Sequence, residues 1–155
     1  MFVLVIPETQ VVLPLLDSDF LEMCLAWAEW NLDTIKDVQW STKKAITVVL
    51  AAKSYPESWS KGKPINLPDE IPDDIIIFHA GTAKDENGKL VTNGGRILDV
   101  TAIADTMEEA SRKVYAIIAQ IEKLNPWEEL NPWLFRYRTD IWKSAIDAER
   151  GEAKK

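Results

Sequence analysis

The sequence is poor in the residues that form metal clusters and disulfides. Its 155 residues include one cysteine, Cys24, and one histidine, His79. A single cysteine forms neither an internal disulfide nor a thiolate zinc cluster, and this usage suits a reducing compartment. Apolar residues surround Cys24 at helical spacing, so we expect a buried thiol. The less favoured alternative, a reactive nucleophile, needs a nearby base.

Positive charge is also scarce. The chain carries 18 lysine and arginine residues against 25 aspartate and glutamate residues, which gives a formal net charge of −7. A protein that binds the phosphate backbone of nucleic acid needs clustered cationic side chains to displace counterions. The acidic balance therefore argues against a broad nucleic-acid interface, and we expect no nucleic-acid partner.

The sequence lacks long hydrophobic runs as well. Residues 1–6 and 45–52 are apolar, but a helix that spans a bilayer needs about 20 such residues. The first run also lacks the basic region of a signal peptide and passes directly into the polar sequence PETQ. We expect a soluble, cytoplasmic protein with no targeting segment and no membrane partner.

The apolar residues that are present favour one mixed domain. They make up 46% of the chain, enough for one compact core. β-Branched runs predict strands, and Asn87-Gly88 predicts a hairpin turn. The expected strands cover residues 2–6, 45–52, 75–79, 82–85, 89–92 and 96–103. The predicted class is α+β, with a β-rich centre and flanking helices.

Two helices are expected beside these strands. The first is capped by Asp17 or Ser18 and ends near Trp30. The second opens with a capping box, Thr106 with Glu109, and presents one apolar stripe. That stripe consists of Ala110, Val114, Ile117, Ile118 and Ile121.

The sequence Asn93-Gly94-Gly95 before Arg96 admits two interpretations. Glycine permits positive φ, so successive amides in such a turn can point at a phosphate or carboxylate, with Arg96 adding charge. The same residues also suit an ordinary tight connection between two strands, which is favoured for this tripeptide taken alone.

Several blocks of the chain resemble phosphoribosylamine–glycine ligase, also called glycinamide ribonucleotide synthetase. TVVLAAKSYPESWSKGKPI, FHAGT, LVTNGGRILDVTA and YRTDI follow in the order and spacing of that family's carboxy-terminal region. PETQVVLPLLDSDFLEMCLA resembles the segment that joins its ATP-grasp domain to the carboxy-terminal domain. The resemblance covers roughly residues 7–147. It implies a small barrel-like β-structure of the rudimentary hybrid-motif kind, with residues 1–40 as the junction strand and helix and 41–150 as the carboxy-terminal domain.

The resemblance also bears on catalysis. The family joins glycine to phosphoribosylamine in purine synthesis, using ATP and magnesium. Its magnesium is held by a strand that carries glutamate and asparagine, whereas the equivalent residues here, 1–6, are Met-Phe-Val-Leu-Val-Ile. Hard cations need oxygen ligands. We therefore expect a detached domain that has no catalytic residues, metal or cofactor of its own, is inactive alone, and needs the missing ATP-grasp domains.

The resemblance implies where substrate lies in the complete enzyme. TNGGR and HAGT would face the cleft between domains, while Glu8 of PETQ contacts substrate or serves as a local cap. A histidine that ends an apolar strand is also commonly a structural group. The candidate residues for the substrate cleft are Glu8, His79, Thr82, Asn93, Gly94, Gly95 and Arg96.

Departures from the family pattern suggest an alternative function. Residues other than glycine stand where the family commonly has it, at Ser54, Glu57, Asp99, Ala104 and Trp142. There are also seven tryptophans. Trp40 and Trp59, where the family often has an aromatic, are expected in the core or lining a site. Less expected tryptophans on one exposed face would make this a natural or engineered protein-binding scaffold. They are Trp27, Trp30, Trp127, Trp133 and Trp142. Otherwise they cover apolar surface by folding over it or by self-association.

Overall fold

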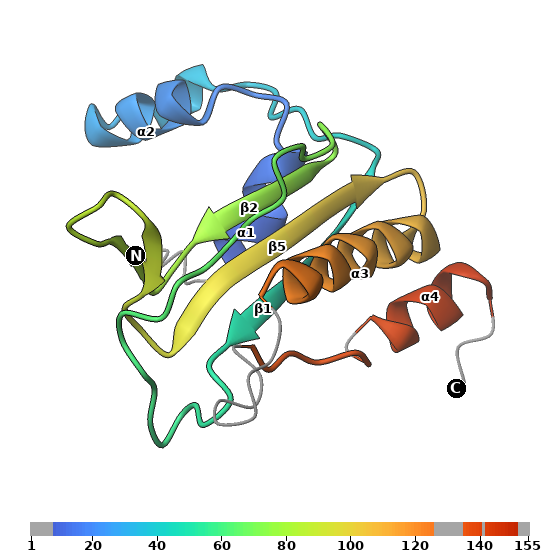
Figure 1. The fold of residues 1–155 in the computed structure, drawn as a ribbon. Coiled ribbons are helices and arrows are strands. Elements are labelled where there is room, and N and C mark those ends of the chain that lie inside the picture. Colours follow the sequence, from blue (N-terminus) through green and yellow to red (C-terminus); the bar gives the residue numbers. More distant parts are fainter. Residues whose placement is uncertain (1–7, 126–134, 141, 152–155) are drawn as a thin grey trace.

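The fold is described from a computed structural model that covers residues 8–125, 135–140 and 142–151. Residues 2–6, expected as a strand, and two of the tryptophans, Trp127 and Trp133, lie outside the described residues. The described chain forms one three-stranded sheet, one two-stranded sheet and helices on both sides of the larger sheet (Figure 1). This arrangement confirms the α+β class, and both described sheets are open.

The larger sheet is antiparallel and is built around one central strand. Its order is β1 (Lys44–Ala51), β5 (Arg96–Ala104) and β2 (Ile75–His79). These three strands match the predicted ones within one or two residues. β5 is buried along nearly its whole length, whereas the edge strand β2 is mostly half-buried. The difference follows from position, because β5 has a neighbour on each side and helices over both faces.

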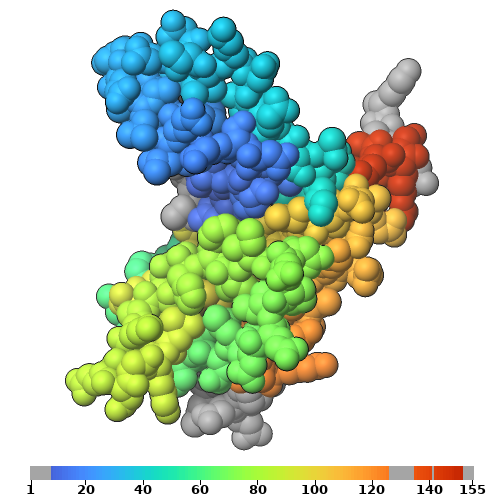
Figure 2. Space-filling model, turned by 90° about the horizontal axis from the view of Figure 1, so that it is seen from above, coloured from blue at the N-terminus to red at the C-terminus, as the bar shows by residue number. Residues whose placement is uncertain are grey.

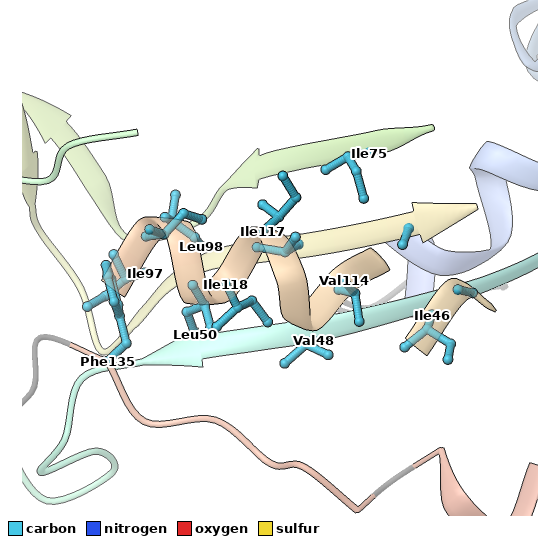
Figure 3. Close-up of a cluster of buried hydrophobic side chains, with 14 of the residues drawn as sticks. Ile46, Val48, Leu50, Ile75, Ile97, Leu98, Val114, Ile117, Ile118 and Phe135 are labelled. Atoms are coloured by element: carbon cyan, nitrogen blue, oxygen red, sulfur yellow. The ribbon is translucent and has the colours of Figure 1, made fainter. Parts of the chain in front are cut away.

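Helix α3 (Met107–Leu124) covers one face of this sheet and closes the core. Val48 and Leu50 of β1 pair with Val100 and Leu98 of β5, and all four are buried. Figure 3 shows these strands beneath the apolar stripe of α3, with Val114 and Ile118 pointing toward the sheet. The whole predicted stripe is buried, and Thr106 accepts a hydrogen bond from the Glu109 amide, as the capping box predicts.

Helix α1 (Glu8–Val12) lies on the opposite face, followed by the short helix η1 (Leu13–Leu15). The Thr101 hydroxyl of β5 donates to the Gln10 carbonyl at 3.0 Å and lies 2.6 Å from the Thr47 hydroxyl of β1. Side chains alternate between the faces of a strand, so Asp99 shares the α1 face with Thr101.

The predicted hairpin forms the smaller sheet. It joins β3 (Thr82–Lys84) to β4 (Leu90–Thr92). At its tip Gly88 has a φ of +77°, and the Asp85 carboxylate accepts from the amides of Asn87 and Lys89, each at 2.8 Å. The turn needs glycine at position 88 because a residue with a β-carbon is strained at positive φ.

Residues 17–40 form an arm that projects from the domain. The arm contains α2 (Phe20–Ala28) and η2 (Leu32–Thr34), and Figure 2 shows it as a separate lobe. Its two ends are tied together where Gln39 accepts from the Asp17 amide and donates its own amide to the Ser18 hydroxyl. The cap of α2 is Asp19 and not the predicted Asp17 or Ser18, because its carboxylate reaches two amides of the first turn.

The carboxy-terminal segment is fastened to α3. Tyr115 of α3 donates to the Arg138 carbonyl at 2.7 Å and accepts from the Trp142 indole at 2.9 Å. Helix α4 (Lys143–Glu149) follows, and Glu149 accepts from the Met107 amide at the start of α3.

The described helices include none that is both long enough and apolar enough to cross a membrane. The proposed division at residue 40 coincides with the end of the arm, and it stays a prediction.

We predict that Ile118→Ala lowers the free energy of unfolding by about 2–5 kcal/mol, because it leaves a cavity between α3 and the sheet. Urea unfolding measures the change. Leu124→Ala is the matched control on the same helix, where the side chain is 42% exposed, and it should change stability by less than about 0.5 kcal/mol. Equal effects of the two substitutions would contradict the position of the core.

Candidate functional site

Two of the predicted motifs meet at one end of the larger sheet. We call residues 79–82 and 93–96 the glycine corner. Gly81 donates its amide to the Arg96 carbonyl at 2.6 Å and accepts from the Asn93 amide at 2.7 Å. His79 Nδ1 lies 3.1 Å from the Thr82 hydroxyl. The fold therefore brings six of the seven predicted cleft residues together, although they come from segments ten or more positions apart.

The glycines of the corner are required for close packing and not for positive φ. Neither Gly94 nor Gly95 has a positive φ, which contradicts the predicted amide turn of that kind. A β-carbon on Gly94 would lie 2.9 Å from the Gly81 α-carbon, and one on Gly95 would collide with the Tyr55 ring. Of the two interpretations of residues 93–95, the ordinary tight connection therefore describes the structure better than the amide turn with positive φ. This connection joins β4 of the smaller sheet to β5 of the larger sheet through tightly packed backbone.

The exposed groups of the corner suit a polar, anionic ligand. His79, Asn93 and Arg96 are exposed, and Thr82 and Gly94 are half-buried. The Gly94 amide donates to no acceptor among the described residues. The corner thus offers hydrogen-bond donors and a guanidinium.

Asp99 is a buried acid that sequence reasoning noted only as a replaced glycine. The residue is 0% exposed, and neither carboxyl oxygen has a hydrogen-bond partner among the described residues. Gln10 Oε1 is also buried without a partner there. Burial raises the pKa of Asp99, and the positive charge of Arg96 partly opposes that rise.

Glu8 is exposed at the start of α1. Among the described residues, no hydrogen bond or ion pair joins it to the glycine corner. Both of its predicted roles, substrate contact and local cap, stay predictions.

The tryptophans that the structure describes lie on separate parts of the fold. Trp27 and Trp30 of the arm are 65% and 90% exposed, as an interface requires. Trp142 is instead half-buried against Tyr115, with ring centroids 6.1 Å apart, and its interface role stays a prediction. Trp127 and Trp133 lie outside the described residues. The protein-binding scaffold therefore has no support from a shared tryptophan surface within the described chain.

Other residues are more exposed than the sequence indicates. Trp40 and Trp59 lie at the surface, which corrects the core alternative of their expected positions and leaves the lining of a site as a prediction. Cys24 is half-buried and not fully buried. Trp40 and Cys24 belong to the arm, where the apolar helical stripe has little of the described chain to pack against.

No group of three or more histidine, cysteine or acidic residues that could hold a metal occurs among the described residues. A shallow depression of about 630 Å³ lies between residues 66–70 and the end of α3, but no predicted site residue lines it. The glycine corner is thus the best-supported candidate site.

Comparisons with known proteins identify the family of the chain. A sequence model of the family described as phosphoribosylglycinamide synthetase, C domain, matches residues 45–143. The chain is 43% identical to the bifunctional purine biosynthetic protein purD of Dictyostelium discoideum, over 91% of this chain and 16% of that protein. It is 36% identical to phosphoribosylamine–glycine ligase of Pasteurella multocida, over 95% of this chain and 32% of that enzyme.

A solved structure resembles the fold. The crystal structure of phosphoribosylamine–glycine ligase from Thermotoga maritima superposes with a TM-score of 0.69 at 36% identity, covering 86% of this chain and 30% of that one. The chain therefore belongs to the phosphoribosylglycinamide synthetase family, within its C domain. It spans less than a third of the length of the relatives it matches.

We predict that Asp99→Asn makes the domain more stable near neutral pH. Below the ordinary pKa of 3.8, the folded and unfolded states both hold the proton. As the pH rises from there through the raised folded-state pKa, the unfolded chain loses its proton first. The wild-type free energy of unfolding then falls by at most about 1.4 kcal/mol per pH unit.

Asparagine imitates the protonated acid and does not ionise, so the variant lacks this loss. Urea unfolding of both proteins across the acidic and neutral range measures the difference. A stability difference that stays constant with pH would contradict a buried acid at this position.

Proposed function

We propose that this chain serves as the carboxy-terminal domain of a phosphoribosylamine–glycine ligase, which joins glycine to phosphoribosylamine in purine synthesis. The observation that carries the proposal is membership of the family over most of the chain, combined with the meeting of HAGT and TNGGR at one corner. The proposal includes a cytoplasmic location.

The domain would supply one wall of the substrate cleft, and the glycine corner would form that wall. ATP and magnesium would be held by the remaining domains, since residues 1–6 contain no side chain that offers an oxygen ligand. In the complete protein, the two open sheets would belong to a barrel-like structure of the rudimentary hybrid-motif kind. The corner residues would orient the phosphoribosyl substrate and not take part in phosphoryl transfer.

The arm would dock the domain onto the remaining domains. Among the described elements, α2 packs substantially only against η2, although most of its residues are apolar. Six large apolar side chains between residues 20 and 32 are at least 40% exposed, and they are Phe20, Leu21, Leu25, Trp27, Trp30 and Leu32. Contiguous apolar surface of this kind usually marks a contact with another protein surface. The relatives extend well beyond this chain, so their additional domains are the proposed occupant.

The direct test mixes the purified chain with the ATP-grasp domains of a related ligase. We expect no glycine-dependent ADP formation from the chain alone and restored formation in the mixture. Arg96→Ala should lower kcat/KM for phosphoribosylamine by about 10–100-fold, the loss of one charged hydrogen bond. Glycine-dependent ATP consumption by the chain alone, or an inactive mixture in which the complex forms, would overturn the proposal.

A second experiment tests docking through the arm. The double substitution Leu21→Ser with Trp30→Ser should weaken binding to the ATP-grasp domains by at least about 10-fold, because interface aromatics carry a large part of binding energy. Sedimentation or calorimetry measures the affinity. Leu124→Ser, at an exposed leucine outside the arm, is the control and should bind as the wild type does. Unchanged affinity of the arm variant would place the interface elsewhere.

A further inference from the structure

Strand β2 forms one edge of the larger sheet, and its outer side has no partner within the described chain (Figure 1). Among the described elements it pairs with β5 alone, and β5 is also the only one with which it makes substantial contact. The side chains of residues 76–78 are half-buried, and His79 is exposed. The outer side of β2 is therefore accessible along the strand.

The hydrogen bonds to β5 show which backbone groups of β2 point outward. The Ala80 amide donates to the Ile97 carbonyl at 3.0 Å, and the Ile103 amide donates to the Asp74 carbonyl at 2.8 Å. Residues of an antiparallel pair alternate between hydrogen-bonded and non-hydrogen-bonded positions. The even-numbered residues of β2 thus bond to β5, and residues 75, 77 and 79 turn their amides and carbonyls away from it.

Most of these outward groups lack a partner. The Ile75 amide donates to the Pro72 carbonyl at 2.9 Å. The amides and carbonyls of Ile77 and His79, and the Ile75 carbonyl, take part in no hydrogen bond among the described residues. An edge with free donors and acceptors is a template on which another strand can pair.

The opposite edge of the sheet, strand β1, is protected. Lys44 stands at its start, and its pairing with β5 shifts register between Leu50 and Ala51. Ala51 also exchanges two backbone hydrogen bonds with Arg136, at 2.9 and 2.6 Å. Lysine, bulges and covering segments are devices that keep a sheet edge from pairing with another chain.

Strand β2 has none of these devices. Its sequence, Ile-Ile-Ile-Phe-His, contains no lysine, proline or acidic residue, and its register with β5 is regular. The two edges of one sheet therefore differ, and only β2 is suited to pairing with a further strand.

The outer side of β2 is complementary to itself. A two-fold axis at Ile77 would place this residue opposite Ile77 of a second copy, with Ile76 opposite Phe78 and Ile75 opposite His79. The Ile77 amide of each copy would then meet the Ile77 carbonyl of the other, and the His79 amide would meet the Ile75 carbonyl. Pairs of aromatic and β-branched side chains stabilise antiparallel strands, and no like charges face each other in this register.

We propose that β2 pairs antiparallel with β2 of a second copy of this chain, so that two three-stranded sheets join into one continuous sheet about a two-fold axis. The same surface serves both partners, as an isologous interface requires. The inference goes beyond the proposed function, which assigns no role to this edge. Because a single short strand buries little area, the dimer should be weak, with a Kd on the order of 0.1 mM.

Sedimentation equilibrium of the purified chain over a range of concentrations tests the dimer. Ile77→Pro removes an amide that points away from β5, so it should leave the pairing within the sheet in place and weaken dimerisation at least about 10-fold. Ile77→Val keeps the amide and is the matched control, and it should dimerise as the wild type does. Urea unfolding of both variants shows whether each is folded.

Cross-linking tests the register without proline. In a Cys24→Ala background, Ile77→Cys should form a disulfide between copies under mild oxidation, since paired α-carbons about 5.5 Å apart lie within disulfide range. His79→Cys in the same background is the control. The proposed register separates the two positions 79 by about 14 Å, so this more exposed thiol should cross-link at least about 10-fold more slowly.

A chain that stays monomeric at millimolar concentration would overturn the proposal. So would a dimer that Ile77→Pro leaves intact, or one that is lost instead in the arm variant Leu21→Ser with Trp30→Ser, because the copies would then associate through another surface. Cross-linking at position 79 as fast as at position 77 would also contradict the register.

Discussion

The packing of α3 on the central strand β5 is the constraint on which the rest of the structure depends. Leu98 and Val100 face the apolar stripe of α3, and β5 is paired on both sides, so neither partner can shift without opening the core. This packing fixes where β5 begins. Because Arg96 is its first residue, the same packing also fixes the position of the glycine corner.

The glycine corner and the arm, two surfaces with functional potential, differ in how they are attached to the packed unit of α3 and β5. The corner is held close to the core by short backbone hydrogen bonds and by glycines that leave no room for a β-carbon. Within the part of the chain that the structure describes, the arm is tied at its base by hydrogen bonds of Gln39 with Asp17 and Ser18, and several of its large apolar side chains are exposed. Under the proposed function, the rigid corner would form one wall of a ligand cleft and the projecting arm would dock the domain onto the other domains.

Much of the fold was predictable because its signals are local. The stripe and the capping box of α3, the Asn87-Gly88 turn and the β-branched runs each depend on near neighbours in the sequence. Membership of the family followed from blocks of sequence, and the comparisons confirm it. The grouping of His79 with the glycine turn was implied by the same blocks.

What the sequence could not reveal depends on contacts that are distant along the chain. An apolar helical stripe does not say what covers it, so Cys24 was expected to be buried although it belongs to the arm. Gly94 and Gly95 look the same whether they serve positive φ or close approach, and only the packed rings and backbone distinguish these uses. The packing of Trp142 against Tyr115 could not be foreseen, because Tyr115 lies on a helix 27 positions earlier.

Native-state hydrogen exchange on the purified chain tests the central claim most directly, namely that α3 and β5 form a self-sufficient frame from which the arm projects uncovered. Amides of β5 and α3 should exchange only through global unfolding, whereas amides of α2 should exchange orders of magnitude faster and slow down when the ATP-grasp domains are added. Exchange from α2 in the chain alone that is as slow as exchange from β5 would contradict the account.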